Sequence, residues 1–254
     1  MIFKVEDLEK MAVCSYTLVH IGASNCQEAS YYDTCHFKRV IWIEALEEIF
    51  LQGLQVLKDF PNQEIYKYLL SDSEDKSVDF FSASNNGESS SLLRPALHKR
   101  IHKSVNFGKS KSMKTTTLNS VLNKHSNSRD RFILVLDVQG AEKMVLDGAN
   151  LILQRVDAIF TEISAIPLYK GQVLFADLNR EISQLGFTLT KHDLSINSPY
   201  GDALYLRGKH NEFQTQKSIV NLSRLIRVRF SRLGIFSNKL KNKLKLTLRS
   251  KNVK

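Results

Sequence analysis

The sequence predicts an α/β fold in which helices cover both faces of a mostly parallel sheet. Three observations lead to this prediction. Apolar runs with the length of strands alternate along the chain with segments of helical period. Some of these runs are apolar throughout, as from Ile133 to Leu136, which is typical of strands buried on both sides. Acidic or small residues follow the runs at their carboxyl ends.

Each element is predicted from its own pattern. The strands are short apolar runs, and the helices repeat apolar residues every three or four positions, as Phe50, Leu54 and Leu57 do. The predicted strands cover residues 15–22, 39–45, 63–72, 131–137, 157–164 and 201–208, and the predicted helices cover 27–37, 47–60, 140–153 and 175–187.

Two segments depart from this alternation and set the predicted boundaries. Residues 82–114 are rich in Ser, Asn and Lys, which predicts a long, mobile insertion. Residues 211–254 interleave apolar and basic residues. We therefore predict one α/β domain over 1–210, carrying the insertion, and a basic tail over 211–254 that is amphipathic or disordered.

The net charge of +10 comes from this tail. Residues 217–254 hold twelve of the 36 Lys and Arg and no acid, so the rest of the chain has 24 bases against 26 acids. The pattern fits an unstructured extension and, equally well, an amphipathic helix on an anionic membrane surface. Because Phe230 and Phe236 offer little for base stacking, no nucleic-acid partner is expected.

The composition indicates a cytoplasmic globular protein. A chain of 254 residues with 43% hydrophobic content is enough to bury a core. No apolar run reaches the roughly 18 residues of a membrane span, and the first residues lack a secretory signal pattern. The cysteines Cys14, Cys26 and Cys35 stand at no metal-ligand spacing. These cysteines are therefore predicted to be reduced thiols and not metal ligands. The basic tail is a candidate for peripheral contact with the inner face of the membrane.

Polar groups stand where the predicted strands end. In open α/β sheets, ligands bind in the crevice outside the carboxyl ends of the strands. We therefore expect these residues to surround a ligand with hydroxyl groups or positive charge, although polar residues also resurface at strand ends without any such role. The residues concerned are Gly22, Glu44, Asp72, Asp137 and Glu162.

The turn after the first predicted strand limits which ligands are expected. Small residues follow Gly22, so a ligand can approach the backbone amides, and Glu44 lies 22 residues further on, the spacing of a carboxylate that binds a ribose diol. This indicates either a dinucleotide or S-adenosylmethionine. The turn reads G-A-S-N-C, without the second glycine that a pyrophosphate needs, and Asp137 suits a positively charged sulfonium. S-adenosylmethionine is therefore favoured.

At these residues the chain resembles the FkbM-type S-adenosylmethionine-dependent methyltransferases. The strongest match is LDVQGAEKMVLDGA at 136–149, similar to the family pattern D-V-[EQ]-G-A-E followed by V-L-x-G-A. The resemblance extends from about Leu18 to about Leu206 and implies a Rossmann-like fold of the class I methyltransferase type. Further matching segments are HIGASNCQE, WIEAL, LLSD, NNGESSSLL, TTTLNSVL and TEISAIPLYKGQ.

The resemblance also implies roles for individual residues. From the chain alone, Glu142 is equally explained as an acid favoured in the first turn of a helix. By resemblance, Gly22, Ala23 and Asn25 shape the pocket for the methionine part of the cofactor, Glu44 holds the ribose, Asp72 lies near the adenine, and Asp137, Glu142 and Glu162 form the reactive centre.

Two residues depart from the family pattern. His20 stands where many methyltransferases have an acid, and Cys26 replaces the glycine that usually ends the first motif. We expect Cys26 to narrow the pocket or to shift the turn.

The insertion holds two further candidates. His98 and His102 are spaced as metal ligands on a helix, but they lie among bases, so a solvated surface is predicted for them. The alternative is contact with a sugar or acidic substrate if the insertion folds over the crevice. The run from Ser89 to Ser91 is predicted to line the acceptor site.

The sequence thus predicts transfer of a methyl group from S-adenosylmethionine to a hydroxyl of a sugar, a glycan or a related small molecule. Asp137 and Glu142 are the candidate bases, because an alcohol must lose its proton. Two alternatives stay open: an enzyme on the same fold that depends on NAD or a nucleotide sugar, and a non-catalytic scaffold at a membrane surface.

Overall fold

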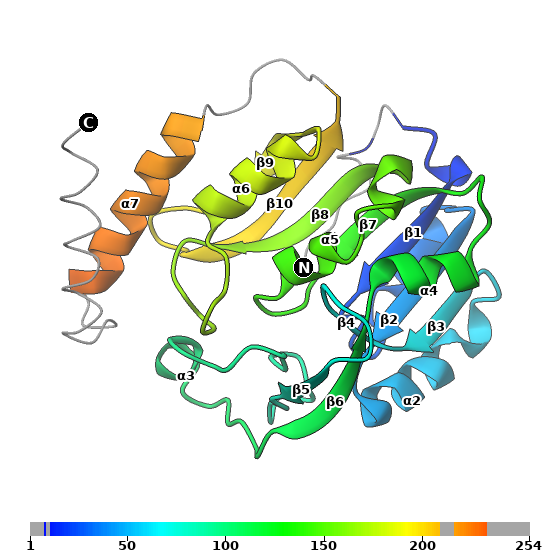
Figure 1. The fold of residues 1–254 in the computed structure, drawn as a ribbon, viewed down its shortest axis with the longest axis horizontal. Coiled ribbons are helices and arrows are strands. Elements are labelled where there is room, and N and C mark those ends of the chain that lie inside the picture. Colours follow the sequence, from blue (N-terminus) through cyan, green and yellow to red (C-terminus); the bar gives the residue numbers. More distant parts are fainter. Residues whose placement is uncertain (1–7, 9–10, 209–215, 233–254) are drawn as a thin grey trace.

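The computed structural model describes residues 8, 11–208 and 216–232. A seven-stranded sheet with the order β3-β2-β1-β7-β8-β10-β9 forms its centre (Figure 1). All neighbours from β3 to β8 are parallel, and β10 is antiparallel to both β8 and β9. Its strands are β1 (Tyr16–Ile21), β2 (Arg39–Glu44), β3 (Gln63–Lys67), β7 (Arg131–Leu136), β8 (Val156–Ser164), β9 (Phe187–His192) and β10 (Tyr200–Arg207).

Helices cover both faces of this sheet, as predicted. Alternate residues of one strand point to opposite sides, so Leu134 and Leu136 join one core cluster while Ile133 and Val135 join the other. Helices α4, α5, α6 and α7 pack on the first side, and α1 packs on the second. The helices are α1 (Ala29–Thr34), α2 (Glu47–Val56), α3 (His98–Ile101), α4 (Leu118–His125), α5 (Glu142–Asp147), α6 (Phe175–Gln184) and α7 (Gln216–Arg232).

The strand order places a ligand crevice between β1 and β7. From β1 the chain continues outward through β2 to β3, whereas β7 continues in the other direction to β8. The loops after β1 and β7 therefore leave the sheet toward opposite sides. A crevice opens at such a switch point, outside the carboxyl ends of the strands.

The third predicted strand, 63–72, is divided in the structure. Its first part, β3, pairs with β2, but the chain then turns, and β4 (Leu69–Leu70) pairs with β6 (Lys111–Thr116). A second sheet with the order β4-β6-β5 results, in which β5 covers Ser77–Phe80. An apolar run does not reveal that its two halves pair with different partners.

Several helix boundaries also differ from the prediction. The predicted helix 140–153 ends at Asp147 and is followed by a separate 3-10 turn, Ile152–Arg155. An added Cβ at Gly148 would lie 2.1 Å from the Ser71 carbonyl oxygen, so this glycine allows close packing at the helix end. The predicted helix 175–187 ends at Gln184, and the strand β9 that follows was missed, as was α4.

The insertion and the start of the tail both pack onto the domain. Figure 1 shows β5, β6 and α3 beside the main sheet and α7 alongside α6. The apolar face of α7, with Ile219, Ile226 and Phe230, is buried in the main core. Residues 233–254 of the predicted tail lie outside the described residues. Within the described part, no helix combines the length and apolar character needed to cross a membrane.

Candidate active site

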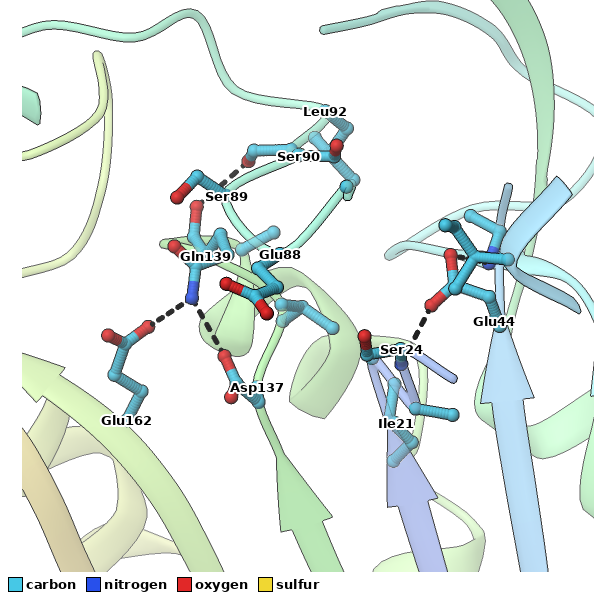
Figure 2. Close-up of a pocket in the computed structure, with 18 of the residues that line it drawn as sticks. Ile21, Ser24, Glu44, Glu88, Ser89, Ser90, Leu92, Asp137, Gln139 and Glu162 are labelled. Carbon is cyan, nitrogen blue, oxygen red and sulfur yellow. Dashed lines mark hydrogen bonds between the residues drawn. The ribbon is translucent and has the colours of Figure 1, made fainter. Parts of the chain in front are cut away.

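A cavity of about 480 Å³ lies at the carboxyl ends of β1, β2, β7 and β8. Figure 2 shows Glu44 and Ser24 on one side of it and Asp137, Gln139 and Glu162 on the other. Five of the eight predicted site residues line it. These are Gly22, Ala23, Glu44, Asp137 and Glu162.

The turn after β1 brings the chain against the end of β7. Gly22 has φ +83°, and an added Cβ would lie 1.8 Å from the carbonyl oxygen of Asp137. The backbone amides of Gly22 and Ala23 both donate to the Ile43 carbonyl. Only glycine combines this conformation with so close a backbone approach, so Gly22 joins β1, β2 and β7 at the cavity floor.

Glu44 ends β2 as a fixed carboxylate. Its Oε2 accepts the Ser24 amide at 3.1 Å, and its Oε1 accepts the amides of Ala45 at 2.9 Å and Leu46 at 2.8 Å. Burial raises the pKa of Glu44 to about 7, against the lowering effect of these three hydrogen bonds. A carboxylate has about four acceptor positions, so Oε2 retains one for a ligand hydroxyl.

Opposite Glu44, two carboxylates share one amide. The Gln139 Nε2 donates to Asp137 Oδ1 at 2.8 Å and to Glu162 Oε2 at 3.1 Å. Burial raises the pKa of both acids, and Asp137 raises that of Glu162 further by repulsion between like charges. The charges of neighbouring acids add to burial at Glu162, whereas at Asp137 burial is opposed by the shorter Gln139 hydrogen bond, so Asp137 is the acid better able to stay ionised.

The orientation of Gln139 is set by the residues behind it. Its φ of +52° is in the left-handed region, and its carbonyl accepts the Ser91 hydroxyl at 2.8 Å. The Tyr169 hydroxyl lies 2.9 Å from Gln139 Oε1 and 2.8 Å from the Ser89 carbonyl. Because the Tyr169 hydroxyl can donate to Oε1, the oxygen of the Gln139 amide faces Tyr169 and its NH₂ group faces the two acids. Both carboxylates accept hydrogen bonds, so they need this donor between them.

Glu142 differs from its predicted place at the reactive centre. It is buried outside the cavity wall, and its Oε1 accepts the Gly140 amide at 2.9 Å, which holds the turn before α5. Gly140 has φ +96°, and Glu142 thus stabilises a left-handed turn. The second acid of the motif supports the backbone rather than lining the cavity.

Asp72 and Asn25 also lie outside the cavity wall. Asp72 is exposed and accepts the hydroxyls of Ser71 and Ser73, because the chain turns away after β3 and carries it past the cavity. Tyr68, Leu69 and Leu70 line the wall where Asp72 was expected.

The two departures from the family pattern have local explanations. His20 is buried, stacks on Trp42 with ring centroids 4.8 Å apart, and has its Nδ1 3.1 Å from the Tyr32 hydroxyl. Burial lowers the pKa of His20 to about 3, so the ring is neutral.

Cys26 has φ +59° and lies in an apolar cluster outside the cavity wall, so it does not narrow the pocket as expected. All three cysteines, which lie in the described part, are free thiols as predicted.

One part of the wall is apolar. These side chains come from α2, from β4 and β5 of the second sheet, and from the loop after β5. Such a wall buries the flat face of an aromatic ring. The side chains are Ile49, Leu69, Leu70, Phe80 and Leu92.

The insertion closes another part of the wall. Ser89, Ser90 and Ser91 line the cavity, where the sequence predicted an acceptor site. His98 is buried and lines the cavity together with His102, so the predicted solvated surface was wrong for His98. The reason is tertiary, because α3 is only one turn long and packs onto the loop after β8.

Sequence reasoning missed several lining residues. Glu28 faces the cavity from the start of α1, and Tyr200 faces it from the first position of β10. Gln139 was visible in the motif, but only the fold shows that it joins two acids. The sequence predicts that the acids line the cavity, because each stands at the end of an apolar run. No sequence pattern marks the polar and aromatic residues that lie between them.

The profile of the "Methyltransferase FkbM domain" matches residues 19–189. The chain belongs to the FkbM methyltransferase family. The predicted family and enzyme class are thereby confirmed: the chain is an S-adenosylmethionine-dependent methyltransferase. This assignment sets aside the NAD-dependent and non-catalytic alternatives. A search of curated proteins gave no significant match.

Solved structures similar to this FkbM methyltransferase are remote in sequence. The structure of TrmK from M. capricolum, in complex with S-adenosylhomocysteine, is 11% identical in sequence, with a TM-score of 0.49, and the match covers 97% of this chain and 86% of its own. The magnesium protoporphyrin IX methyltransferase of Synechocystis, with bound S-adenosylmethionine, is 9% identical, with a TM-score of 0.44 and coverage of 80% and 76%. Similarity this remote gives no information on the methyl acceptor.

Proposed function

We propose that this FkbM methyltransferase methylates a hydroxyl of a sugar, a glycan or a related small molecule, with Asp137 as the base. The observation that carries the proposal is the amide of Gln139 between Asp137 and Glu162 at the cavity wall. An alcohol acceptor must lose its proton, and a carboxylate held at the reactive end of the cavity is suited to take it.

The residues present fit S-adenosylmethionine. Glu44 keeps one acceptor position free for a ribose hydroxyl, and the apolar wall around Phe80 suits an adenine ring. Asp137 and Glu28, which both line the cavity, supply the negative charge that a sulfonium and an ammonium group favour. The volume of about 480 Å³ is within the range of small-molecule sites.

The proposed roles follow from this arrangement. When bound, S-adenosylmethionine supplies an activated methyl group whose transfer is an in-line displacement at carbon, so alignment of the acceptor accounts for much of the catalysis. Asp137 accepts the hydroxyl proton, and Glu162 positions the acceptor beside it. Gln139 keeps both carboxylates in place and favours the ionised form of Asp137.

The serine run supports a polar acceptor. Ser89, Ser90 and Ser91 line the cavity, and the Ser90 hydroxyl accepts the Ala83 amide. A wall of hydroxyl groups and carboxylates matches the hydrogen-bonding groups of a sugar better than those of an apolar acceptor.

The function is tested by cofactor binding and product analysis. Calorimetry is expected to show binding of S-adenosylmethionine and none of NAD. Incubation with labelled cofactor and a panel of sugars and amines is expected to label a sugar oxygen, identified by NMR of the product. Exclusive labelling of nitrogen would contradict the proposal.

Binding of the cofactor is expected to depend on pH through Glu44. The pKa of Glu44 is raised to about 7 by burial, so its carboxyl is protonated below that pH and accepts a ribose hydroxyl poorly. The dissociation constant for S-adenosylmethionine should therefore fall as the pH rises through 7, by up to about tenfold per unit on the acid side. Calorimetry of Glu44→Gln should show weaker binding without this dependence; a wild-type dissociation constant that is flat across this range would exclude the ribose role.

Tyr169→Phe is expected to lower kcat about three- to tenfold by releasing the Gln139 amide. Loss of the Gln139 hydrogen bond raises the pKa of Asp137, so the acid limb of the pH–rate profile should move to higher pH. The matched control is Tyr205→Phe, because the buried Tyr205 hydroxyl has no hydrogen-bond partner among the described residues. If the two variants share one pH profile, Tyr169 does not position Gln139.

A further inference from the structure

The insertion belongs to a long stretch without acids. Between Ser89 and Arg129 the chain has nine Lys and Arg and no Asp or Glu. The body of the chain up to residue 216 is close to neutral, so this stretch is a local concentration of positive charge.

Backbone hydrogen bonds fix part of this stretch at the cavity. The amides of Ala96 and His98 donate to the Leu168 carbonyl, and the Lys170 amide donates to the Arg94 carbonyl. The insertion is thus tied to the loop after β8, the strand that carries Glu162. One turn of helix, α3, is therefore held at the cavity, which its His98 lines together with Glu162.

The inner surface of this region is lined by rings. The ring of His98 lies 4.6 Å from that of His102 and 5.4 Å from that of Tyr169, and His102 lies 5.6 Å from Tyr200. His98 is 3% exposed, and its Nδ1 has no hydrogen-bond partner among the described residues. A buried ring nitrogen without a partner is costly, and a hydroxyl-bearing ligand can satisfy it.

The outer surface of the same turn is cationic. Lys99 and Lys103 are exposed, and neither forms an ion pair with a described residue. The Lys99 ammonium lies 5.5 Å from the centroid of Phe107, whose ring is 5.4 Å from His98. The lysine charge is therefore held close to the histidines that line the cavity.

Charge determines how an acceptor enters this site. Asp137 and Glu162 repel an anion inside the cavity, whereas Lys99 and Lys103, each next in the chain to a histidine that lines the cavity, attract one outside it. An acceptor whose hydroxyl lies at the two carboxylates and whose anionic group extends past the histidines to the lysines satisfies both. A neutral acceptor would leave the two lysines without a partner.

We infer that the insertion forms the acceptor subsite and that the acceptor is a hydroxyl-bearing ring carrying a phosphate or carboxylate group. His98, His102 and Tyr200 contact the ring, and Lys99 and Lys103 bind the anionic group. This inference rests on the proposed function, because it assigns the substrate class of the same cavity.

The test is calorimetry on the full-length protein saturated with S-adenosylhomocysteine. Glucose 1-phosphate, glucose and inorganic phosphate serve as probes. We expect glucose 1-phosphate to bind about tenfold more tightly than glucose or phosphate alone, since charge-assisted hydrogen bonds add to ring contacts. The double substitution Lys99→Gln/Lys103→Gln should abolish this preference, and Lys58→Gln/Lys76→Gln, two exposed lysines outside the insertion, should keep it.

A second variant separates the ring from the anion. His98→Phe keeps a ring in the wall but removes its nitrogens, so both glucose and glucose 1-phosphate should bind more weakly while their ratio is unchanged. Unchanged affinity for both sugars would remove His98 from the subsite.

Other outcomes would overturn the inference. These are no binding of glucose 1-phosphate, equal affinity for both sugars, or a preference that survives in Lys99→Gln/Lys103→Gln. Loss of binding to phosphatidylglycerol vesicles in that variant, with glucose 1-phosphate binding intact, would assign the lysines to a lipid surface instead. Methyl transfer to neutral sugars alone would contradict the acceptor subsite and leave the proposed function standing. Phosphate-dependent binding without methyl transfer to any hydroxyl would contradict the proposed function and leave the subsite standing.

Discussion

Asp137→Ala is expected to lower kcat by about 10²- to 10⁴-fold while S-adenosylmethionine still binds. The substitution removes the carboxylate proposed to accept the hydroxyl proton, and leaves intact the Glu44 side of the cavity, which lies opposite (Figure 2). Single-turnover kinetics with saturating cofactor, together with calorimetry, would measure the two effects separately. Wild-type turnover in this variant would exclude Asp137 as the base.

Two conservative variants sharpen this experiment. Asp137→Asn keeps the size of the side chain but cannot take a proton, so it should be nearly as slow as Asp137→Ala. Glu142→Gln keeps an oxygen that can accept the Gly140 amide, and Glu142 lies outside the cavity wall, so this variant should retain most of its activity. Equal losses in Asp137→Asn and Glu142→Gln would return Glu142 to the reactive centre.

Gly22→Ala is expected to destabilise the fold by about 2–5 kcal/mol and to abolish cofactor binding. The new Cβ would lie 1.8 Å from the Asp137 carbonyl oxygen at a residue with φ +83°. The ends of β1 and β7 must then separate, which displaces both the first turn and Asp137. Urea unfolding and calorimetry with S-adenosylmethionine would measure the two effects.

The chain offers a matched control for this substitution. Gly171 has φ +87°, but an added Cβ there would meet no heavy atom within 4 Å. Gly171→Ala therefore carries the backbone strain without the collision and should cost about 1 kcal/mol. If both variants lose the same stability, the close contact between Gly22 and Asp137 is not what holds the cavity floor.

The parts of the site that the sequence predicted share one physical origin. Gly22, Glu44 and Asp137 follow apolar runs of parallel strands, and such strands end at the same edge of a sheet. Asp72 does not line the cavity, because its apolar run is divided between two sheets and the chain turns before reaching it. The expected residues lie at the cavity where one apolar run formed one strand, and their roles stay predictions.

The insertion shows the opposite case. Its polar composition predicted a mobile segment and a solvated His98, yet backbone hydrogen bonds to Leu168 bring it against the cavity. No period or motif in residues 82–114 indicates this pairing, since the partner, the loop after β8, lies far along the chain. Contacts between distant segments depend on the fold as a whole.

The sequence by itself determined the doubly wound sheet, the family, the cofactor and the glycine and acids of the first motifs. These properties depend on local patterns, namely apolar period, chain spacing and turn residues. The tertiary structure alone decided that Glu142 supports a turn, that Gln139 joins Asp137 to Glu162, and that His98 lines the cavity. Each of these depends on which side chains meet across separate elements, and burial and hydrogen bonding then set their chemistry.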